Sequence, residues 1–391
     1  MSRFLFVVPP FVSHVNPTLA VGAELAARGH AVAWVAYAAM RPMFAADATL
    51  FAIESSLDDA TLAQLRHDAG APWLAGYRVL IERIVVPLAR HMLPYADDAI
   101  ARFEPDVVVS DEQALAGGLA ARRRGIQWAT SSSTAALWSN GLDAFPQVRA
   151  WTAEKLAELQ RDAGVYPLDD PGVSRELVLL YTTRAFACPD RRCPASYRFV
   201  GPALGARRDD TEFPWESLRA RPRVFVSLGS LFLDRGERFF ATLVEALADT
   251  ALQVVVHAPP HAIPDPPENF LVRPWVPLLR LYPELDAVVT HAGTTVNEAL
   301  LYGLPSVVAP IAHEQSFFAD RAVASGASIR IRFKRVSAPE LRGAVLEVLG
   351  NPAYRAAAQR VQCEFIAAGG AIAAADALTE LSTRTMGAPG R

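Results

Sequence analysis

The sequence predicts an α/β protein made of two similar halves, each built around a parallel β-sheet. Residues 1–37 have the pattern of a strand, a helix and a second strand. A second alternation of short apolar runs and helical patterns covers residues 224–332. Between them, residues 201–222 are polar and rich in proline and glycine, as linkers are. Because strands that alternate with helices form parallel sheets covered by those helices, we expect this architecture in both halves.

The first strand–helix–strand unit is the clearest local pattern. Arg3–Val8 is a short apolar run typical of a buried parallel strand. Asn16 is the expected N-cap of the helix that follows, with Pro17 at its first position. Gly29 is expected to end this helix as its C′ residue. Ala31–Tyr37 is the next predicted strand, which completes a βαβ unit.

The rest of the first half is less regular. Residues 55–102 have a helical pattern with scattered aromatic side chains. Val107–Ser110 is a predicted buried strand that places Asp111 at its carboxyl end, and Ile126–Thr130 is the following strand. Residues 134–185 do not alternate cleanly, so we expect mixed helix and loop there.

The second half contains six runs with the length and composition of buried strands. They are Val224–Leu228, Leu252–His257, Phe270–Val272, Ala287–Thr290, Ser306–Ala309 and Ile329–Arg332. Helical patterns separate most of them, which indicates a second parallel sheet. The predicted organisation is an N-terminal domain over residues 1–205, a linker over 206–222, a C-terminal domain over 223–375 and a tail over 376–391.

Charge and hydropathy exclude several classes of protein. The net charge of −3, from 38 basic and 41 acidic residues, gives no field to attract nucleic acid or an anionic membrane. The longest uninterrupted apolar run, Ala31–Met40, is far shorter than the ~20 residues of a spanning helix. The first residues lack the apolar length and cleavage site of a signal peptide. We therefore expect a soluble cytoplasmic protein.

The cysteines indicate neither a disulfide framework nor a metal site. There are three, Cys188, Cys193 and Cys363, and an odd, low count argues against structural disulfides. Cys188 and Cys193 have no second pair and no nearby histidine, so no zinc site is expected there.

Two polar residues follow predicted strands of the first half. His14 precedes the predicted helix, whose positive end favours a neutral imidazole that can accept a proton. The alternative is a loop histidine that caps its own turn. Asp111 stands at a buried strand end and needs a partner there. It could orient His14, as the acid orients the base in Ser-His-Asp sites, or it could cap the helix after Gln113.

Glycine and polar residues also follow strands of the second half. After Val224–Leu228, Gly229 allows close approach of a ligand to the backbone and Ser230 offers a hydroxyl, although an ordinary turn would use the same residues. Farther along, Glu314 and Gln315 place a carboxylate and an amide where sugar hydroxyls could bind.

The segment His291–Leu300 has the most site-like pattern. A strand leads into a tight glycine turn and then a helix, and the exposed N–H groups with the helix dipole suit a diphosphate. His291, Thr294 and Thr295 could add hydrogen bonds. The alternative is a capping box formed by Thr295 and Glu298, which needs no ligand. The chain has neither GxGxxG nor GxxxxGK[ST], so a plain dinucleotide or P-loop site is disfavoured.

Taken in order, these motifs resemble those of the family 1 glycosyltransferases. The matching stretches are Ser13–Leu19 with Arg28–His30, Phe199–Pro202, Val226–Ser230, Trp275–Pro277 and His291–Gln315. The resemblance covers nearly the whole chain and is greatest to bacterial enzymes that glycosylate macrolides, polyketides, indolocarbazoles and carotenoids. Two positions depart from the family: Leu278 stands where Gln is frequent, and Glu314 replaces an Asp.

The resemblance implies the GT-B fold, in which two Rossmann-like domains with parallel sheets face each other across a cleft. The N-terminal domain would take the acceptor and the C-terminal domain the nucleotide sugar. The last helix, within residues 355–385, would cross back to the N-terminal domain.

The resemblance also implies a role for each motif residue. His14 would be the general base and Asp111 its partner. Donor-binding roles would fall to Trp275 stacked on the nucleobase, Val276 through its backbone, Glu298 on the ribose, Ser230, His291, Gly293, Thr294 and Thr295 around the diphosphate, and Glu314 and Gln315 on the sugar. The aromatic residues Trp73, Tyr77 and Trp138 would line an apolar acceptor cleft, or would be core residues instead.

The implied reaction is inverting transfer of a hexose or deoxyhexose from a UDP- or TDP-sugar to a hydroxyl of an apolar small-molecule natural product. No cofactor and no metal are expected, because no Asp-x-Asp pair lies at a strand end and the helix dipole can stabilise the leaving diphosphate. Two alternatives are a nucleotide-sugar epimerase of the same fold and a non-catalytic nucleotide-sugar binder. A homodimer is possible on this sequence.

Overall fold

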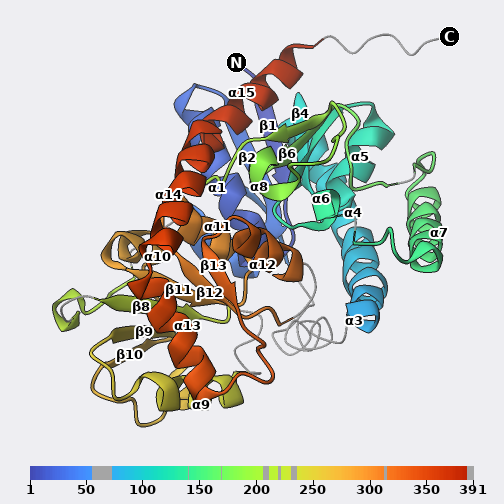
Figure 1. Cartoon of the computed structure of the whole chain (residues 1–391). Helices are drawn as coiled ribbons and strands as arrows, with labels where there is room; N and C mark the ends of the chain where they lie inside the picture. Colours follow the sequence, from blue (N-terminus) through green and yellow to red (C-terminus); the bar gives the residue numbers. More distant parts are fainter. Residues whose placement is uncertain are drawn as a thin grey trace.

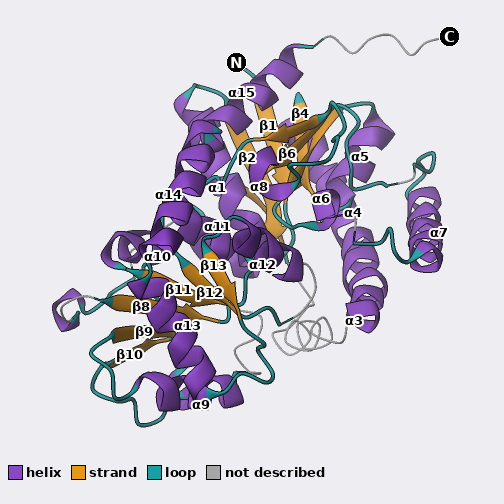
Figure 2. Cartoon of the chain, in the orientation of Figure 1, coloured by secondary structure: helices purple, strands orange, loops and turns teal. Residues whose placement is uncertain are grey.

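The computed structural model describes residues 1–54, 73–139, 141–168, 170–205, 211–218, 222–229, 236–311 and 315–384, with side chains from residue 76 onward in the second of these segments. It contains two all-parallel β-sheets. Figure 1 and Figure 2 show them as separate layers joined by helices along one side of the molecule. The two predicted halves are therefore both present.

The first sheet has seven strands in the order β3-β2-β1-β4-β5-β6-β7. They are β1 (Arg3–Val7), β2 (Ala31–Tyr37), β3 (Thr49–Ile53), β4 (Val107–Asp111), β5 (Gln127–Ser132), β6 (Leu177–Leu180) and β7 (Tyr197–Phe199). Its helices are α1 (Val12–Ala27), α3 (Trp73–Val79), the π-helical segment η2 (Leu80–Val85), α4 (Val86–Phe103), α5 (Ala116–Arg124), α6 (Ala136–Ser139), α7 (Pro146–Asp162) and α8 (Arg184–Ala187).

The second sheet has six strands in the order β10-β9-β8-β11-β12-β13. They are β8 (Arg223–Ser227), β9 (Gln253–His257), β10 (Phe270–Arg273), β11 (Ala287–Thr290), β12 (Ser306–Val308) and β13 (Ser328–Arg330). The helices that follow them are α9 (Glu237–Leu247), α10 (Leu278–Leu281), α11 (Thr294–Leu301), α12 (Gln315–Ala324), α13 (Ala338–Gly350), α14 (Pro352–Ala367) and α15 (Gly370–Thr383).

Every predicted strand is a strand in the structure, with ends that differ by at most two residues. Three strands, β3, β6 and β7, were not predicted. β3 and β7 are the edge strands of the first sheet and are partly exposed. The apolar run of β3, residues 50–53, was not recognised as a strand, and β7 has only three residues with Arg198 in the middle. β6 is buried but has only four residues, too short to stand out from its irregular surroundings.

The predicted start of the first helix is wrong. Helix α1 begins at Val12 after the extended residue Phe11, so Asn16 and Pro17 lie inside it. The Phe11 carbonyl accepts from the N–H of His14 at 3.0 Å and from that of Val15 at 3.1 Å. Pro17 donates no hydrogen bond, but the loss of one bond does not prevent the helix. The predicted helix end is confirmed: α1 ends at Ala27, and Gly29 follows with φ +82°.

Helix α15 returns to the first sheet, as the resemblance implied. Its residues Ala374, Ala375, Leu378 and Leu381 are buried in the same apolar core as β1 and β4. On the surface, Arg28, the residue after α1, binds Asp376 of α15 at 2.6 Å. Figure 1 shows α13, α14 and α15 following one another from the second sheet to the first. The boundary that we predicted at residue 375 falls within α15, and parts of the predicted linker at 206–222 lie outside the described residues.

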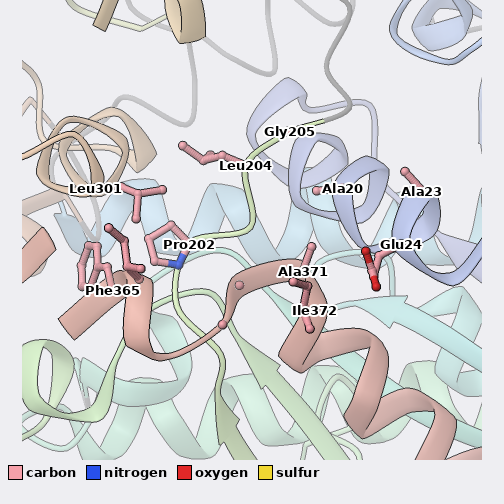
Figure 3. A pocket seen from close by; sticks show the side chains of 13 residues that line it. Ala20, Ala23, Glu24, Pro202, Leu204, Gly205, Leu301, Phe365, Ala371 and Ile372 are labelled. Atoms are coloured by element: carbon pink, nitrogen blue, oxygen red, sulfur yellow. The ribbon is translucent and has the colours of Figure 1, made fainter. Parts of the chain in front are cut away.

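Two glycines allow the chain to cross itself where α14 meets α15. Gly370 has φ +56° and donates its N–H to the Val200 carbonyl at 2.6 Å. Gly201 has φ +77°, and a Cβ there would lie 2.8 Å from the Phe365 carbonyl oxygen. Figure 3 shows the adjacent pocket of about 460 Å³, where α1, the segment from Pro202 to Gly205 and the α14–α15 turn meet.

Among the described residues, one helical stretch is apolar and long enough to cross a membrane by length and composition alone, Pro352–Thr383. It consists of α14 and α15, which are interrupted at Gly369 and Gly370. Its buried residues belong to two different protein cores, with Phe365 in one and Leu378 in the other. Buried residues shared between two cores are typical of helices that pack inside a folded protein.

Candidate functional site

Each sheet has one point where the strand order reverses, and several of the predicted site residues lie at these two points. In the first sheet, β1 and β4 are neighbours and the chain leaves them in opposite directions, which places His14 beside Asp111. In the second sheet, β8 and β11 are neighbours, which places Gly229 beside His291. Ligands of open α/β sheets bind in the crevice at such reversals.

His14 and Asp111 form a buried, hydrogen-bonded pair. The His14 Nδ1 lies 2.9 Å from Asp111 Oδ1 and 3.0 Å from Oδ2. The two residues are only 5% and 1% exposed. Because a carboxylate only accepts, Nδ1 carries the proton and Nε2 carries the lone pair of the neutral ring. Asp111 also accepts from the Gln113 N–H at 2.9 Å, so it both orients His14 and caps the turn.

His14 lies in the first turn of α1 rather than before the helix. The helix dipole disfavours a positive imidazole there, whereas the adjacent carboxylate of Asp111 favours one. The pair can therefore accept a proton on His14 and stabilise the resulting imidazolium, as a general base and its orienting acid do.

A second acidic residue, Glu112, lies next to this pair and was missed by the sequence analysis. Its carboxylate accepts from the Ser132 hydroxyl and from the Thr134 N–H, both at 2.8 Å. Burial, and then the negative charge of Asp111, raise the pKa of Glu112 to about 7. The only sequence signal was a second acidic residue directly after a buried strand.

His291 is held between two glycines. A Cβ at Gly229 would lie 2.5 Å from His291 Cε1, and a Cβ at Gly293 would lie 2.6 Å from His291 Nε2. Gly229 has φ +72°, and Ala292 also has a positive φ of 63°, which is uncommon for a residue with a side chain. Burial lowers the pKa of His291 to about 4, so its ring is neutral near pH 7. Such strain and close approach are typical of functional sites.

Helix α11 presents an uncapped N-terminus beside His291. It begins at Thr294 after Gly293, and no side chain caps it. The capping box of Thr295 and Glu298 is therefore not formed, because Thr295 is already the second helical residue. The first-turn N–H groups lack a side-chain acceptor from the cap, which is the arrangement that anions bind.

Glu298 lies on the buried side of α11. It is 7% exposed and accepts from the Tyr282 hydroxyl at 3.0 Å. The Tyr282 ring in turn stacks on Tyr302, with ring centroids 4.9 Å apart. Tyr282 was also missed by the sequence analysis, because nothing in its local sequence distinguishes it from a core aromatic residue.

Trp275 has the exposure expected of a stacking platform. It is 59% exposed, and its ring centroid lies 5.9 Å from that of His257. His257 Nδ1 lies 3.1 Å from the Ser227 hydroxyl oxygen, which also accepts from the Gly229 N–H at 3.1 Å. His257, at the end of β9, was missed although a polar residue at a strand end was a usable signal. Val276 is partly buried against the core below Trp275.

The other predicted site residues have different outcomes. Gln315 begins α12, is buried, and accepts from the Ile311 N–H at 2.9 Å. Ser230 and Glu314 lie outside the described residues, as does the side chain of Trp73.

The two remaining aromatic residues of the predicted acceptor cleft differ in placement. Tyr77 lines a cavity of about 720 Å³ in the N-terminal half. Trp138 is 4% exposed and packs edge-on against Phe318 at 5.3 Å, which joins α6 to α12 of the second half. That packing gives Trp138 a structural place between the halves and leaves little of its surface for a ligand.

No group of three or more His, Cys, Asp or Glu side chains placed to hold a metal ion is found in the part of the chain that the structure describes. The metal-free expectation stays a prediction.

The chain is similar in sequence to known proteins over almost its whole length. Residues 241–381 match the family model described as "Erythromycin biosynthesis protein CIII-like, C-terminal domain". Over its whole length the chain is similar to 4'-demethylrebeccamycin synthase of Lentzea aerocolonigenes, with 29% identity over 97% of this chain and 99% of that protein. These matches bear out the resemblance to the family 1 glycosyltransferases.

Further relatives of this glycosyltransferase agree. The oleandomycin glycosyltransferase of Streptomyces antibioticus is 28% identical, over 95% of this chain and 89% of that protein. The crystal structure of the glycotransferase of kitacinnamycin has a TM-score of 0.79 and 26% identity, and covers 97% of this chain and 99% of that one. The fold is therefore GT-B, and the chain is an enzyme that transfers a sugar.

Proposed function

We propose that this glycosyltransferase transfers a sugar, with inversion at the anomeric carbon, from a UDP- or TDP-activated donor to a hydroxyl of an apolar small molecule. The observation that carries the proposal is the buried pair of His14 and Asp111 at the strand-order reversal; the next two residues, Glu112 and Gln113, line a cavity of about 720 Å³ whose wall is mostly apolar. A positioned base beside a pocket for an organic acceptor suits activation of a hydroxyl group.

In the proposed reaction, the acceptor oxygen attacks the anomeric carbon while its proton moves to His14 Nε2. The bond from that carbon to the diphosphate oxygen breaks on the opposite face, and the nucleoside diphosphate leaves with the electron pair. Asp111 stabilises the imidazolium that forms. General-base catalysis of this kind contributes roughly 10²–10⁴-fold to the rate.

The leaving diphosphate is proposed to bind at the N-terminus of α11. Its uncapped N–H groups and helix dipole can stabilise the negative charge that builds up on the leaving group. The neutral His291 ring, fixed between Gly229 and Gly293, can add a hydrogen bond without a change of charge. We therefore expect turnover to persist without a divalent cation.

The nucleoside is proposed to stack on Trp275, with Glu298 binding the ribose hydroxyls. The exposure of Trp275 and the support of Glu298 by Tyr282 favour these roles. Because Leu278 and Glu314 differ from the residues frequent in the family, both uracil and thymine remain candidate bases, and glucose is only one of the candidate sugars.

Calorimetric titration with UDP and TDP, each with and without magnesium, tests the donor half of the proposal. Metal-independent binding in the micromolar range would support it, and the tighter nucleotide would identify the donor class. Absence of binding by both would contradict it.

For the chemical step, His14→Ala should lower turnover by at least about 100-fold while nucleotide affinity is retained. Unchanged turnover in that variant would remove His14 from the mechanism.

A further inference from the structure

The cavity beside the catalytic pair has an unusual mixture of surfaces. Its volume of about 720 Å³ suits a drug-sized organic ligand. Apolar side chains from η2, the loop after β4, α6 and α7 form most of its wall, among them Ile81, Leu115, Leu137 and Leu156. Glu112 also lines it, one residue after Asp111.

Two neutral hydrogen-bond donors hold the Glu112 carboxylate in this wall. The Ser132 hydroxyl donates to Oε2 and the Thr134 N–H to Oε1, which fixes the plane of the carboxylate. A carboxylate offers about four acceptor positions, so these two hydrogen bonds leave about two positions unused. In the described part of the chain, no Lys, Arg or His forms an ion pair with Glu112.

Among the described residues that line the cavity, acidic side chains outnumber basic ones. Arg149 is the one basic residue among the described lining residues, but its side chain is 66% exposed and lies 3.8 Å from Asp143. Asp170 adds a second acidic side chain at the edge. When it is ionised, Glu112 therefore gives the interior of the cavity a negative potential.

We propose that Glu112 is a specificity-determining residue that selects acceptors carrying a protonated amine on their apolar skeleton, away from the hydroxyl that receives the sugar. The inference rests on the proposed function, because it takes the cavity to be the acceptor site. An ammonium group would donate to the unused acceptor positions of Glu112 in a charge-assisted hydrogen bond. An acceptor with a carboxylate at the same place would be repelled.

The environment of Glu112 agrees with this assignment. Burial and the charge of Asp111 hold its pKa at about 7, so the ionised form is costly without a nearby positive charge. A bound ammonium supplies that charge. With a neutral acceptor bound, only His14, already paired with Asp111, is seen to offset the charge of Glu112 among the described residues.

The test is calorimetric binding of three naphthols that differ in one substituent on the second ring: aminomethyl, hydroxymethyl or carboxylate. The intact protein should bind the aminomethyl compound at least about tenfold more tightly than the hydroxymethyl compound, and the carboxylate most weakly. In Glu112→Gln the tenfold preference should fall below about twofold, with hydroxymethyl affinity little changed. Glu176→Gln is the control, because Glu176 also accepts from a serine hydroxyl but does not line the cavity.

Equal affinity of the unmodified protein for the aminomethyl and hydroxymethyl compounds would overturn the proposal, and this comparison needs no variant that must fold. Retention of the preference in a folded Glu112→Gln protein would overturn it as well. Because binding is measured without a donor, a failure of sugar transfer would count against the proposed reaction, while the amine preference still tests Glu112.

Discussion

Replacing Asp111 by Asn should remove most of the catalytic benefit of His14 while leaving its position almost unchanged. The Asn side chain has the same shape and can still accept from the Gln113 N–H, which now bonds to Asp111 Oδ1 at 2.9 Å. What it lacks is the negative charge 2.9–3.0 Å from His14 Nδ1. That charge matters when His14 becomes an imidazolium in the transition state.

The size of the effect follows from the burial of the pair. Two opposite charges whose centres are about 4 Å apart attract by about 4 kcal/mol at an effective dielectric constant of about 20. Since Asp111 is 1% exposed and His14 is 5% exposed, water screens this attraction little. Loss of most of it, about 3–4 kcal/mol, corresponds to a fall in kcat of roughly 10²–10³-fold.

The assay is steady-state sugar transfer with saturating donor, together with nucleotide affinity and a thermal melt. Asp106→Asn is the matched control, because Asp106 lies just before the other end of β4 and bonds the Arg3 N–H at 2.8 Å, away from His14. We expect kcat to fall only in Asp111→Asn and nucleotide affinity to be unchanged in both variants. A fall of less than about tenfold in a folded Asp111→Asn protein would refute the imidazolium argument.

Three further predictions concern the donor half and the chain crossing. Because burial lowers the pKa of His291 to about 4 from an ordinary 6.5, unfolding takes up a proton in that window, and stability falls as the pH decreases, by up to about 3 kcal/mol. The free energy of unfolding in urea, measured at about pH 7 and about pH 5, should change less between these pH values in His291→Asn than in the unmodified protein. An equal change in the two proteins would contradict the prediction. Tyr282→Phe should weaken UDP or TDP binding about fivefold through the lost bond to Glu298; lower stability with unchanged affinity would make that bond purely structural. Gly29→Ala, with φ +82° and open space around it, should cost about 1 kcal/mol, and Gly201→Ala about 1–3 kcal/mol more because of the Phe365 carbonyl. Equal denaturation midpoints for these two variants would show that the backbone around Gly201 shifts enough to accommodate the added methyl group.

The sheets could be predicted because a buried parallel strand is a continuous apolar run. Val107–Asp111, for example, is buried at every position. The start of α1 could not be predicted locally, because the preference of Asn16 and Pro17 for a helix start was weaker than the backbone bonds made at Phe11. Local propensity is a weak guide where tertiary packing decides.

The catalytic pair could be named residue by residue, but its contact depends on β1 and β4 being neighbours, a property of the whole sheet. Glu112 escaped prediction for the same reason. Its hydrogen bonds come from Ser132 and Thr134, which are distant in sequence and carry no signal that points to it. The position of His291 between two glycines likewise depends on Gly229, which follows a different strand, β8.

The return of α15 to the first sheet has a consequence for biosynthesis. The core around β1 receives Ala374, Ala375, Leu378 and Leu381 only after the entire second sheet has been translated. Until then, the apolar side of α1 that α15 covers is exposed on the ribosome-bound chain. Such contacts between residues that are distant in sequence slow folding, and they leave an intermediate with exposed apolar surface that is prone to aggregate. The N-terminal half, although made first, should therefore be the half that reaches its final packing last.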